Sequence, residues 1–400
     1  MLWHNGGVVT GPADWVWFAF IFAFGCCVGS FLNVVIYRVP RNKSIVRPLS
    51  ACPACGEHIR CYDNIPLLSW LLLGARCRYC KAPISPRYFI IELLTGLVFI
   101  GLFYLYFYAD ICSGIGPFLW GGWYIYLLHI ILLSGLIAVS AIDLELWIIP
   151  ISVCWFVTGA GLAGSMAGGY IIHPAVIRCY TLLPIASAGT GILAAGAAVG
   201  LAISLILLSK GIIKRSYEVD YYLGNPDKQP VTENPENIVP EEKINHRLEV
   251  CKEVIFLLPI IVCSAAAYLI VSRISPVRLW WIGLLQHQAV AGLLGSLWGY
   301  FIGCTIVWAT RIFGTLGFGK EAMGLGDVHL MGAAGAVIGP VFVVVAFFVA
   351  PFFGLAWAAV QFFIRKSRHI PYGPFLSLGI LTVMIFHDRI LYHLNAMFYR

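Results

Sequence analysis

The chain has 400 residues, of which 60% are hydrophobic and only 11% are charged. This small number of polar side chains cannot cover the surface of a soluble domain of this size. The composition therefore indicates a polytopic helical membrane protein that contacts lipid. The formal net charge of +7 does not indicate a nucleic-acid partner, because the basic residues lie in loops between apolar segments.

Ten apolar segments predict an all-α fold with about ten transmembrane helices, since a span takes about 20 residues. The segments are 15–37, 88–108, 122–142, 147–167, 182–209, 254–272, 279–308, 330–347, 349–364 and 373–396. The division of 330–364 is the least certain from sequence, because two breaks are available, at Gly339-Pro340 and at Pro351-Phe352-Phe353-Gly354. We predict two short helices there.

The basic residues predict the topology. They follow the first apolar run instead of preceding it, so this run is expected to be a retained anchor with its N-terminus outside. Ten spans then put the C-terminus outside as well and five loops in the cytoplasm. These loops are 38–87, 143–146, 210–253, 309–329 and 365–372, and they hold 21 of the 26 Lys and Arg residues. This distribution agrees with the positive-inside rule.

The loop 38–87 contains Cys52-Pro-Ala-Cys55 and Cys77-Arg-Tyr-Cys80. Two Cys-x-x-Cys pairs at this spacing are typical of a zinc ribbon, in which four thiolates bind one Zn²⁺ ion. A cytoplasmic location disfavours disulfides. His58 and Cys61 are alternative ligands, but we expect them not to bind the ion. Because so small a domain buries little apolar surface, zinc would supply much of its folding free energy.

Two acidic residues lie where hydrophobic runs begin or end. Asp327 follows Gly324-Leu325-Gly326, and Asp143 precedes Ile149-Pro150. Charges at the membrane boundary are costly and often functional. Two such carboxylates, brought together, would form an aspartyl protease site. The structural alternatives are a helix N-cap for Asp143, and a cap or a Lys320 ion pair for Asp327.

Two further acids have simpler interpretations. Glu145 cannot share a helical face with Asp143, two residues away, so we interpret it as a boundary residue. For Glu92 we expect an ion pair with Arg87 or a loop arginine, and contact with a substrate or methyl donor is the alternative.

At this point the sequence resembles the type IV prepilin peptidases, a family of GxGD-type intramembrane aspartyl proteases. The matching segments are 29–40 (Gly-Ser-Phe-Leu-Asn-Val-Val-Ile-Tyr-Arg-Val-Pro), the paired Cys-x-x-Cys, 64–70 (Asn-Ile-Pro-Leu-Leu-Ser-Trp), 85–88 (Ser-Pro-Arg-Tyr), Glu92, Asp143 with Ile149-Pro150, 319–327 (Gly-Lys-Glu-Ala-Met-Gly-Leu-Gly-Asp) and 371–375 (Pro-Tyr-Gly-Pro-Phe).

The resemblance implies a bifunctional enzyme of type IV pilus or type II secretion systems in the bacterial inner membrane. Such an enzyme cleaves the leader of prepilins or pseudopilins at the cytoplasmic face, with Asp143 and Asp327 as its catalytic pair. It also methylates the new N-terminus with S-adenosylmethionine, for which we expect the region around Asn64, Pro66 and Trp70 to be responsible. The alternatives are a peptidase without methyltransferase activity, and a transporter that uses the two acids as ion sites.

The chain departs from the family pattern at two places. His329 stands where the family usually has Lys, which predicts activity that depends on pH near neutrality. The segment 165–278 is interpreted as an insertion of two helices around the loop 210–253, which we expect to be solvated and partly disordered. The predicted domains are 1–37 (first helix), 38–87 (zinc-binding domain), 88–164 (helices carrying Asp143), 165–278 (insertion) and 279–400 (helices carrying Gly324 to Asp327).

Overall fold

A computed structural model of the chain describes residues 14–109, 111, 115, 118, 121–172, 182–216, 245–364 and 371–398. The helices are α1 (Asp14–Arg38), η1 (Val39–Arg41), η2 (Cys61–Asn64), α2 (Leu68–Leu72), α3 (Pro86–Phe107), α4 (Gly122–Leu146), α5 (Ile151–Ile171), α6 (Ala188–Ser209), α7 (His246–Arg273), α8 (Ser275–Leu285), α9 (Gln288–Phe318), α10 (Leu325–Ile338), α11 (Pro340–Ile364), α12 (Gly373–Ile385) and α13 (His387–Phe398). Two isolated bridges are the only β-pairing among these residues.

The all-α membrane fold is confirmed. In the part of the chain that the structure describes, eight helices are long and apolar enough to cross a membrane, and the pair α12 and α13, bent by 78°, forms a candidate ninth span. The remaining expected segment, 330–347, corresponds to α10, an apolar helix of 14 residues. Both termini and most of the loops 210–253 and 365–372 lie outside the described residues, so the predictions for them remain predictions.

Helix α10 ends at the first of the two breaks proposed for 330–364. Gly339 has a φ of +84°, a conformation that favours glycine, and Pro340, which has no amide hydrogen to donate, begins α11. The other candidate, Pro351, lies inside α11. The expected boundary between 347 and 349 is therefore wrong, because one glycine-proline step is enough to divide the run.

The expected span 279–308 is also displaced. It is divided between α8 and α9, and α9 continues to Phe318. A prediction from hydropathy ends this span too early, because the last turns of α9 contain polar residues that are buried in the protein. Arg311 and Thr315 are 1% and 2% exposed, respectively.

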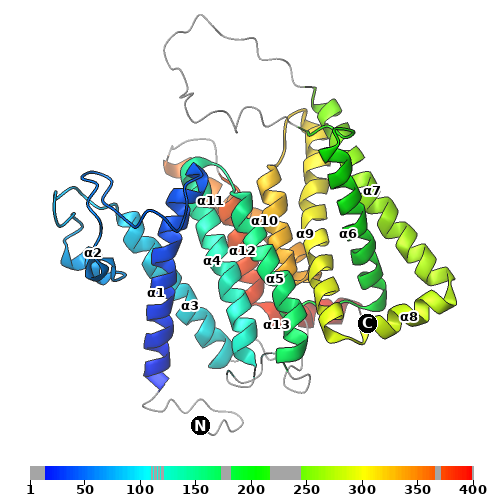
Figure 1. The fold of residues 1–400 in the computed structure, drawn as a ribbon, viewed down its shortest axis with the longest axis horizontal. Helices are drawn as coiled ribbons and strands as arrows, with labels where there is room; N and C mark the ends of the chain where they lie inside the picture. The colour runs from blue at the N-terminus through cyan, green and yellow to red at the C-terminus, as the bar shows by residue number, and fades with distance from the viewer. Residues whose placement is uncertain are drawn as a thin grey trace, which may run out of the picture.

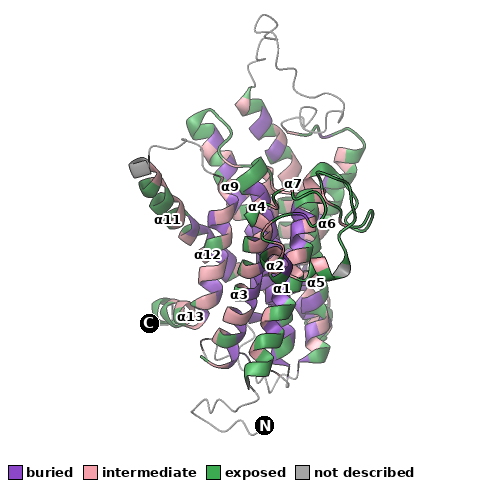
Figure 2. Ribbon diagram, turned by 90° about the vertical axis from the view of Figure 1, so that its left-hand side faces the viewer, coloured by how far each residue is buried: buried purple, intermediate pink, exposed green. Residues whose placement is uncertain are grey.

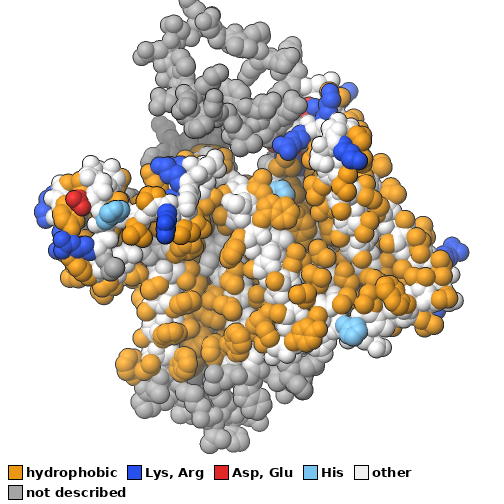
Figure 3. All heavy atoms as spheres, in the orientation of Figure 1, with side chains coloured by type: hydrophobic (Ala, Val, Ile, Leu, Met, Phe, Trp, Pro, Cys, Tyr) orange, Lys and Arg blue, Asp and Glu red, His pale blue; other side chains and the backbone are white. Residues whose placement is uncertain are grey.

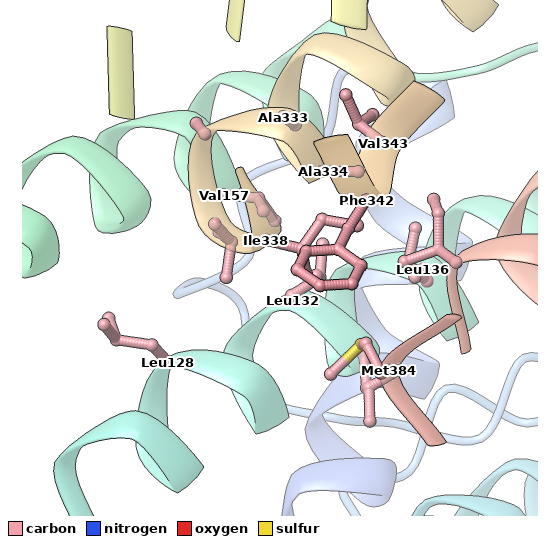
Figure 4. Close-up of a cluster of buried hydrophobic side chains, with 14 of the residues drawn as sticks. Leu128, Leu132, Leu136, Val157, Ala333, Ala334, Ile338, Phe342, Val343 and Met384 are labelled. Atoms are coloured by element: carbon pink, nitrogen blue, oxygen red, sulfur yellow. The ribbon is translucent and has the colours of Figure 1, made fainter. Parts of the chain in front are cut away.

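Helices α4, α5, α9 and α10 form the middle of the molecule, with α12 beside them (Figure 1). Helix α10 is buried almost all round, so its apolar side chains follow no single face. Leu132 and Leu136 of α4, Val157 of α5, Ile338 of α10 and Phe342 of α11 meet in one cluster (Figure 4). Buried residues concentrate in this central region, whereas the small domain around α2 is largely exposed (Figure 2).

Helices α9 and α10 approach one another closely through glycines. A Cβ atom at Gly299 would lie 2.0 Å from the Gly335 carbonyl oxygen, and one at Gly303 would lie 2.2 Å from the Met331 carbonyl oxygen. Small residues that allow such close approach are characteristic of helix packing in membranes. The crossing fixes the middle of α10, around Met331 and Gly335, relative to α9.

Two peripheral parts flank this core on opposite sides (Figure 1). The small domain 38–87 connects α1 to α3 on one side, and α6, α7 and α8 lie on the other. Helix α7 packs on α6 where a Cβ at Gly200 would lie 2.4 Å from the Pro259 carbonyl oxygen. Only 6% of the most apolar stretch of α7 is buried inside the protein, so most of this helix is available to lipid.

Replacing Gly299 with alanine is expected to destabilise the protein by about 1 to 3 kcal/mol, because the added methyl group meets backbone that cannot rotate away. Thermal unfolding of the purified protein in detergent measures this change. Gly101→Ala in α3 is the control, since a Cβ there meets nothing within 4 Å. Equal melting temperatures for the two variants would contradict the close crossing of α9 and α10.

Candidate active site and metal centre

Asp143 lies in the last turn of α4 and is 6% exposed. Its Oδ2 atom accepts a hydrogen bond of 3.0 Å from the backbone N–H of Gly373, at the start of α12. The alternative in which Asp143 is an N-cap is wrong, because α5 begins at Ile151 and its N-cap is Pro150. The carboxylate instead connects the end of one helix to the beginning of another, distant in sequence.

Asp327 lies in the first turn of α10 and is 8% exposed. Its carboxylate interacts with the backbone amide of Gly324, the N-cap residue of α10, where the helix dipole favours a negative charge. Asp327 therefore helps to cap α10, although Gly324 is the N-cap residue. No ion pair between Asp327 and Lys320 occurs among the described residues. The Oδ1 atom of Asp327 is buried and has no hydrogen-bond partner. Such an atom is costly unless a proton, a water or a substrate satisfies it.

Ile149 packs between the two acidic segments. A Cβ at Gly326 would lie 2.6 Å from Cβ of Ile149, and one at Gly373 would lie 3.5 Å from its Cδ1. At Gly373 the added atom would also lie 2.7 Å from Oδ2 of Asp143. Glycine is therefore required at both positions, because any larger side chain would separate the segments that carry the acids.

The two carboxylates are close enough to interact electrostatically. In general, two neighbouring carboxyl groups in an apolar environment resist double ionisation. One ionised and one protonated carboxyl group can together activate water and polarise a carbonyl. The fold and this site define a class of protein, a polytopic membrane protein with paired aspartates at the ends of its helices.

His329 lies two residues after Asp327 in α10, about half a turn further, and is half-buried. Its ring packs against Trp155 of α5, with 5.8 Å between the ring centroids. Residues two apart on a helix do not face each other, so the His329 ring faces α5, and the pH dependence expected from it remains a prediction.

The four cysteines of the loop 38–87 form one cluster. Their sulfur atoms all lie within 4.8 Å of one another, and those of Cys52 and Cys80 are 3.8 Å apart. Two similar turns build the cluster. In one, Cys52 N–H donates to the Glu57 carbonyl at 2.9 Å, and in the other Cys77 N–H donates to the Ala82 carbonyl at 2.8 Å. This is a four-thiol group of the kind that could bind zinc.

The backbone around Cys77 favours its thiolate form. The N–H groups of Cys80 and then Tyr79 hydrogen-bond to its sulfur and lower the pKa of this thiol to about 6. Metal binding requires a thiolate, so the local backbone already suits a cation at this position.

The region around Asn64, Pro66 and Trp70 packs on α3. Asn64 ends η2, Pro66 precedes α2, and the indole of Trp70 lies against Phe89 with 5.1 Å between the ring centroids. The Trp70 indole N–H donates to the Ile84 carbonyl at 3.4 Å. These contacts join the small domain to the first turn of α3.

Glu92 of α3 also contacts this region through a hydrogen bond. Its Oε2 atom accepts a hydrogen bond of 2.8 Å from the N–H of Leu67, a residue with a φ of +61°. The expected ion pair with Arg87 is wrong, because Arg87 pairs with Glu145 at 2.6 Å instead. Glu145, which we interpreted as a boundary residue, therefore forms an ion pair with Arg87 in the first turn of α3. Sequence spacing could not reveal either pairing, since both join different elements.

Sequence reasoning also missed Gly373 as the donor to Asp143, and it missed a buried ion pair between Glu253 and Arg311, at 2.8 Å. Gly373 stood within a recognised motif, Pro371 to Phe375, but its role depends on a contact across 230 residues. Nothing in the pattern around Glu253 connects it to Arg311.

Comparison with known proteins gives two family matches. Residues 23–106 match the bacterial peptidase A24 N-terminal domain, and residues 254–359 match the type IV leader peptidase family. The first range contains the four cysteines and the second contains Asp327. Asp143 lies outside both ranges.

Similar proteins include prepilin leader peptidase/N-methyltransferases from three bacteria. The Myxococcus xanthus protein is 49% identical over 156 residues, which cover 39% of this chain and 40% of the relative. The Aeromonas hydrophila protein is 33% identical over 39% of this chain and 58% of the relative, and the Klebsiella pneumoniae protein is 38% identical over 39% and 65%. The chain thus matches between 40% and 65% of these relatives' length.

No solved structure matches the chain. The two family matches and the relatives confirm the resemblance to the type IV leader peptidase family.

Glu92→Ala is expected to loosen the segment around Leu67, because it removes the acceptor of a partly buried backbone N–H. Hydrogen–deuterium exchange of peptides covering 62–72 should become faster. Glu145→Ala is the control, because it removes a partly exposed ion pair with the same helix and leaves the Leu67 hydrogen bond intact. Unchanged exchange in Glu92→Ala would show that this carboxylate does not hold the loop.

Proposed function

We propose that the protein is a membrane aspartyl endopeptidase that removes the leader of type IV prepilins or pseudopilins and methylates the new N-terminal residue. The observation that supports the peptidase activity best is the pair Asp143 and Asp327. Both are buried, they interact electrostatically, and one oxygen of Asp327 has no partner. The names of the relatives in the leader peptidase family supply the substrate class.

In the proposed reaction the two carboxyl groups act as one unit with a single proton. The ionised group removes a proton from water, whose oxygen attacks the scissile carbonyl, and the protonated group donates a hydrogen bond to the carbonyl oxygen. The proton taken from water then passes to the amide nitrogen, and the C–N bond of the tetrahedral intermediate breaks to release the new N-terminal amine. The titration belongs to the pair, so neither residue alone is assigned as base or acid. The N–H of Gly373 orients the Asp143 carboxylate while this occurs.

The location of the acids at helix ends suits a substrate that enters from the membrane boundary. A prepilin has a polar leader followed by a hydrophobic helix, so its cleavage site lies where lipid meets water. We place this boundary at the cytoplasmic face of the inner membrane, with both termini outside. The positive-inside rule supports this orientation, because most of the Lys and Arg side chains in view lie at one end of the helices and on the small domain, with a few more near the junction of α7 and α8 (Figure 3).

We assign methyl transfer from S-adenosylmethionine to the small domain, around Asn64, Pro66 and Trp70. The support is the second activity in the names of the relatives, together with the contacts that hold this region on α3. A leader peptidase without methyltransferase activity is the alternative.

We further propose that Cys52, Cys55, Cys77 and Cys80 hold a structural Zn²⁺ ion. Four thiolates within reach of one ion suit the tetrahedral geometry of zinc and leave no open position for a reacting water. The ion would cross-link the two turns of a domain that has little apolar core of its own.

A transporter that uses the two acids as ion sites is the second candidate function. Transport sites usually lie near mid-membrane between broken helices. Asp143 and Asp327 instead lie in the last turn of α4 and the first turn of α10, so the peptidase is favoured.

Asp143→Asn and Asp327→Asn are each expected to reduce leader cleavage at least about 1,000-fold, because the shared proton requires both carboxyl groups. Co-expression with a candidate prepilin, followed by mass spectrometry of the product, measures cleavage and methylation together. Glu145→Gln is the matched control and should keep cleavage. Cleavage by either Asp variant would remove that residue from the mechanism, and a cleaved but unmethylated wild-type product would support the peptidase-only alternative.

Purified protein is expected to contain about one Zn²⁺ ion per chain. Elemental analysis should show loss of this zinc in Cys52→Ser, with a lower melting temperature, whereas Cys27→Ser in α1 should retain it. A wild-type preparation without bound metal would reject the zinc site.

A further inference from the structure

Arg311 is the largest side chain that is fully buried among the described residues, at 1% exposure. It lies near the end of α9, where its Nε atom donates to Glu253 at 2.8 Å. Its Nη1 atom donates to Glu321 at 2.5 Å and also to the backbone carbonyl of Met323. One guanidinium group therefore joins α9, α7 and the loop that precedes α10.

Glu253 supplies the buried negative charge of this group. It lies on α7, is 2% exposed, and accepts hydrogen bonds from the indole of Trp308 at 3.0 Å and from the hydroxyl of Ser216 at 3.3 Å. Both of its oxygens are thus paired. An otherwise lipid-facing helix turns one carboxylate inward, where it neutralises Arg311.

The loop between α9 and α10 is attached to α9 at several points. Arg311 holds the Met323 carbonyl and the Glu321 side chain, and the Thr315 hydroxyl accepts from the Ala322 N–H at 3.3 Å. Met323 directly precedes Gly324, the N-cap of α10, and Asp327 is in the first turn of that helix. The position of Asp327 therefore depends on a loop that Arg311 holds.

We propose that Arg311 is a positioning residue for Asp327, and that Glu253 maintains Arg311 in place, so the helices α6 and α7 support the active site. Glu253 lies within 165–278, the segment interpreted as an insertion, and directly before the matched range 254–359. Without it, Arg311 would retain its ion pair with Glu321, whose side chain is 44% exposed. The inference rests on the proposed peptidase activity only for its kinetic test.

A role limited to folding makes a different prediction. Replacing both members of a buried ion pair with apolar residues often preserves stability, whereas removing one member leaves an unpaired charge buried. The double variant Glu253→Leu/Arg311→Met should therefore fold, but it no longer holds the Met323 carbonyl. If the pair serves only folding, this variant will be fully active. If Arg311 positions Asp327, it will be folded and slow.

The experiment compares Glu253→Leu, Arg311→Met, the double variant and Glu249→Gln in detergent. Glu249 is the matched control, because it is a buried acid of α7 that pairs at 2.7 Å with Lys252 of the same helix. For Arg311→Met and the double variant we expect kcat for prepilin cleavage to fall about 100-fold, as for a displaced catalytic group, with KM changed less than about twofold. Glu253→Leu should lower kcat at least about tenfold. Glu249→Gln should match wild type.

Hydrogen–deuterium exchange of peptides covering 319–327 provides a readout that does not depend on activity. Exchange there should be faster in Arg311→Met and in the folded double variant, and unchanged in Glu249→Gln. Wild-type kcat or wild-type exchange in the double variant would overturn the proposal. If wild type cleaves no prepilin, the proposed function fails, and the exchange measurement still decides whether Arg311 holds the loop.

Discussion

Burial of acidic side chains at the ends of apolar helices is the constraint on which the rest of this structure depends. A carboxylate removed from water is stable only if backbone amides, other charges or a shared proton compensate it. Asp143 receives the N–H of Gly373, Asp327 receives the amide of Gly324 and the field of a helix N-terminus, and Glu253 receives Arg311. The contacts of Asp143 and Glu253 each join two segments that are distant in sequence, whereas that of Asp327 is local to the start of α10.

Glycines make these meetings possible. Gly326 and Gly373 allow Ile149 to lie between the two acidic segments, and Gly299 allows α10 to press against α9. Because backbone then contacts backbone at Met331 and Gly335, the middle of α10 has little freedom to move relative to α9. The same core separates the small cysteine-containing domain from α6 and α7, which lie on opposite sides of it (Figure 1). The domain reaches the core through Glu92, and α7 reaches it through Glu253.

Much of this arrangement was predictable where the signal is local. The Gly339-Pro340 step predicts a helix break because it combines a glycine conformation with the loss of a donor, and the paired Cys-x-x-Cys predicts a four-thiol cluster. The extent of α9 was not predictable from hydropathy, because Arg311 looks like a loop residue until its partners are known. The predicted ion pair between Glu92 and Arg87 was wrong for a similar reason. Sequence spacing suggests side-chain partners, whereas the observed partner is the backbone N–H of Leu67.

The sequence by itself determined that this is an all-α membrane protein, roughly where most of its helices lie, and which acids and cysteines are candidates for a site. These properties follow from composition, periodicity and short motifs, which act over a few residues. Only the tertiary structure decided that Gly373 meets Asp143, that Ile149 lies between the acids, and that Arg311 joins α7 to the loop before Asp327. Such contacts depend on which helix faces pack together, and no local pattern in the chain specifies that.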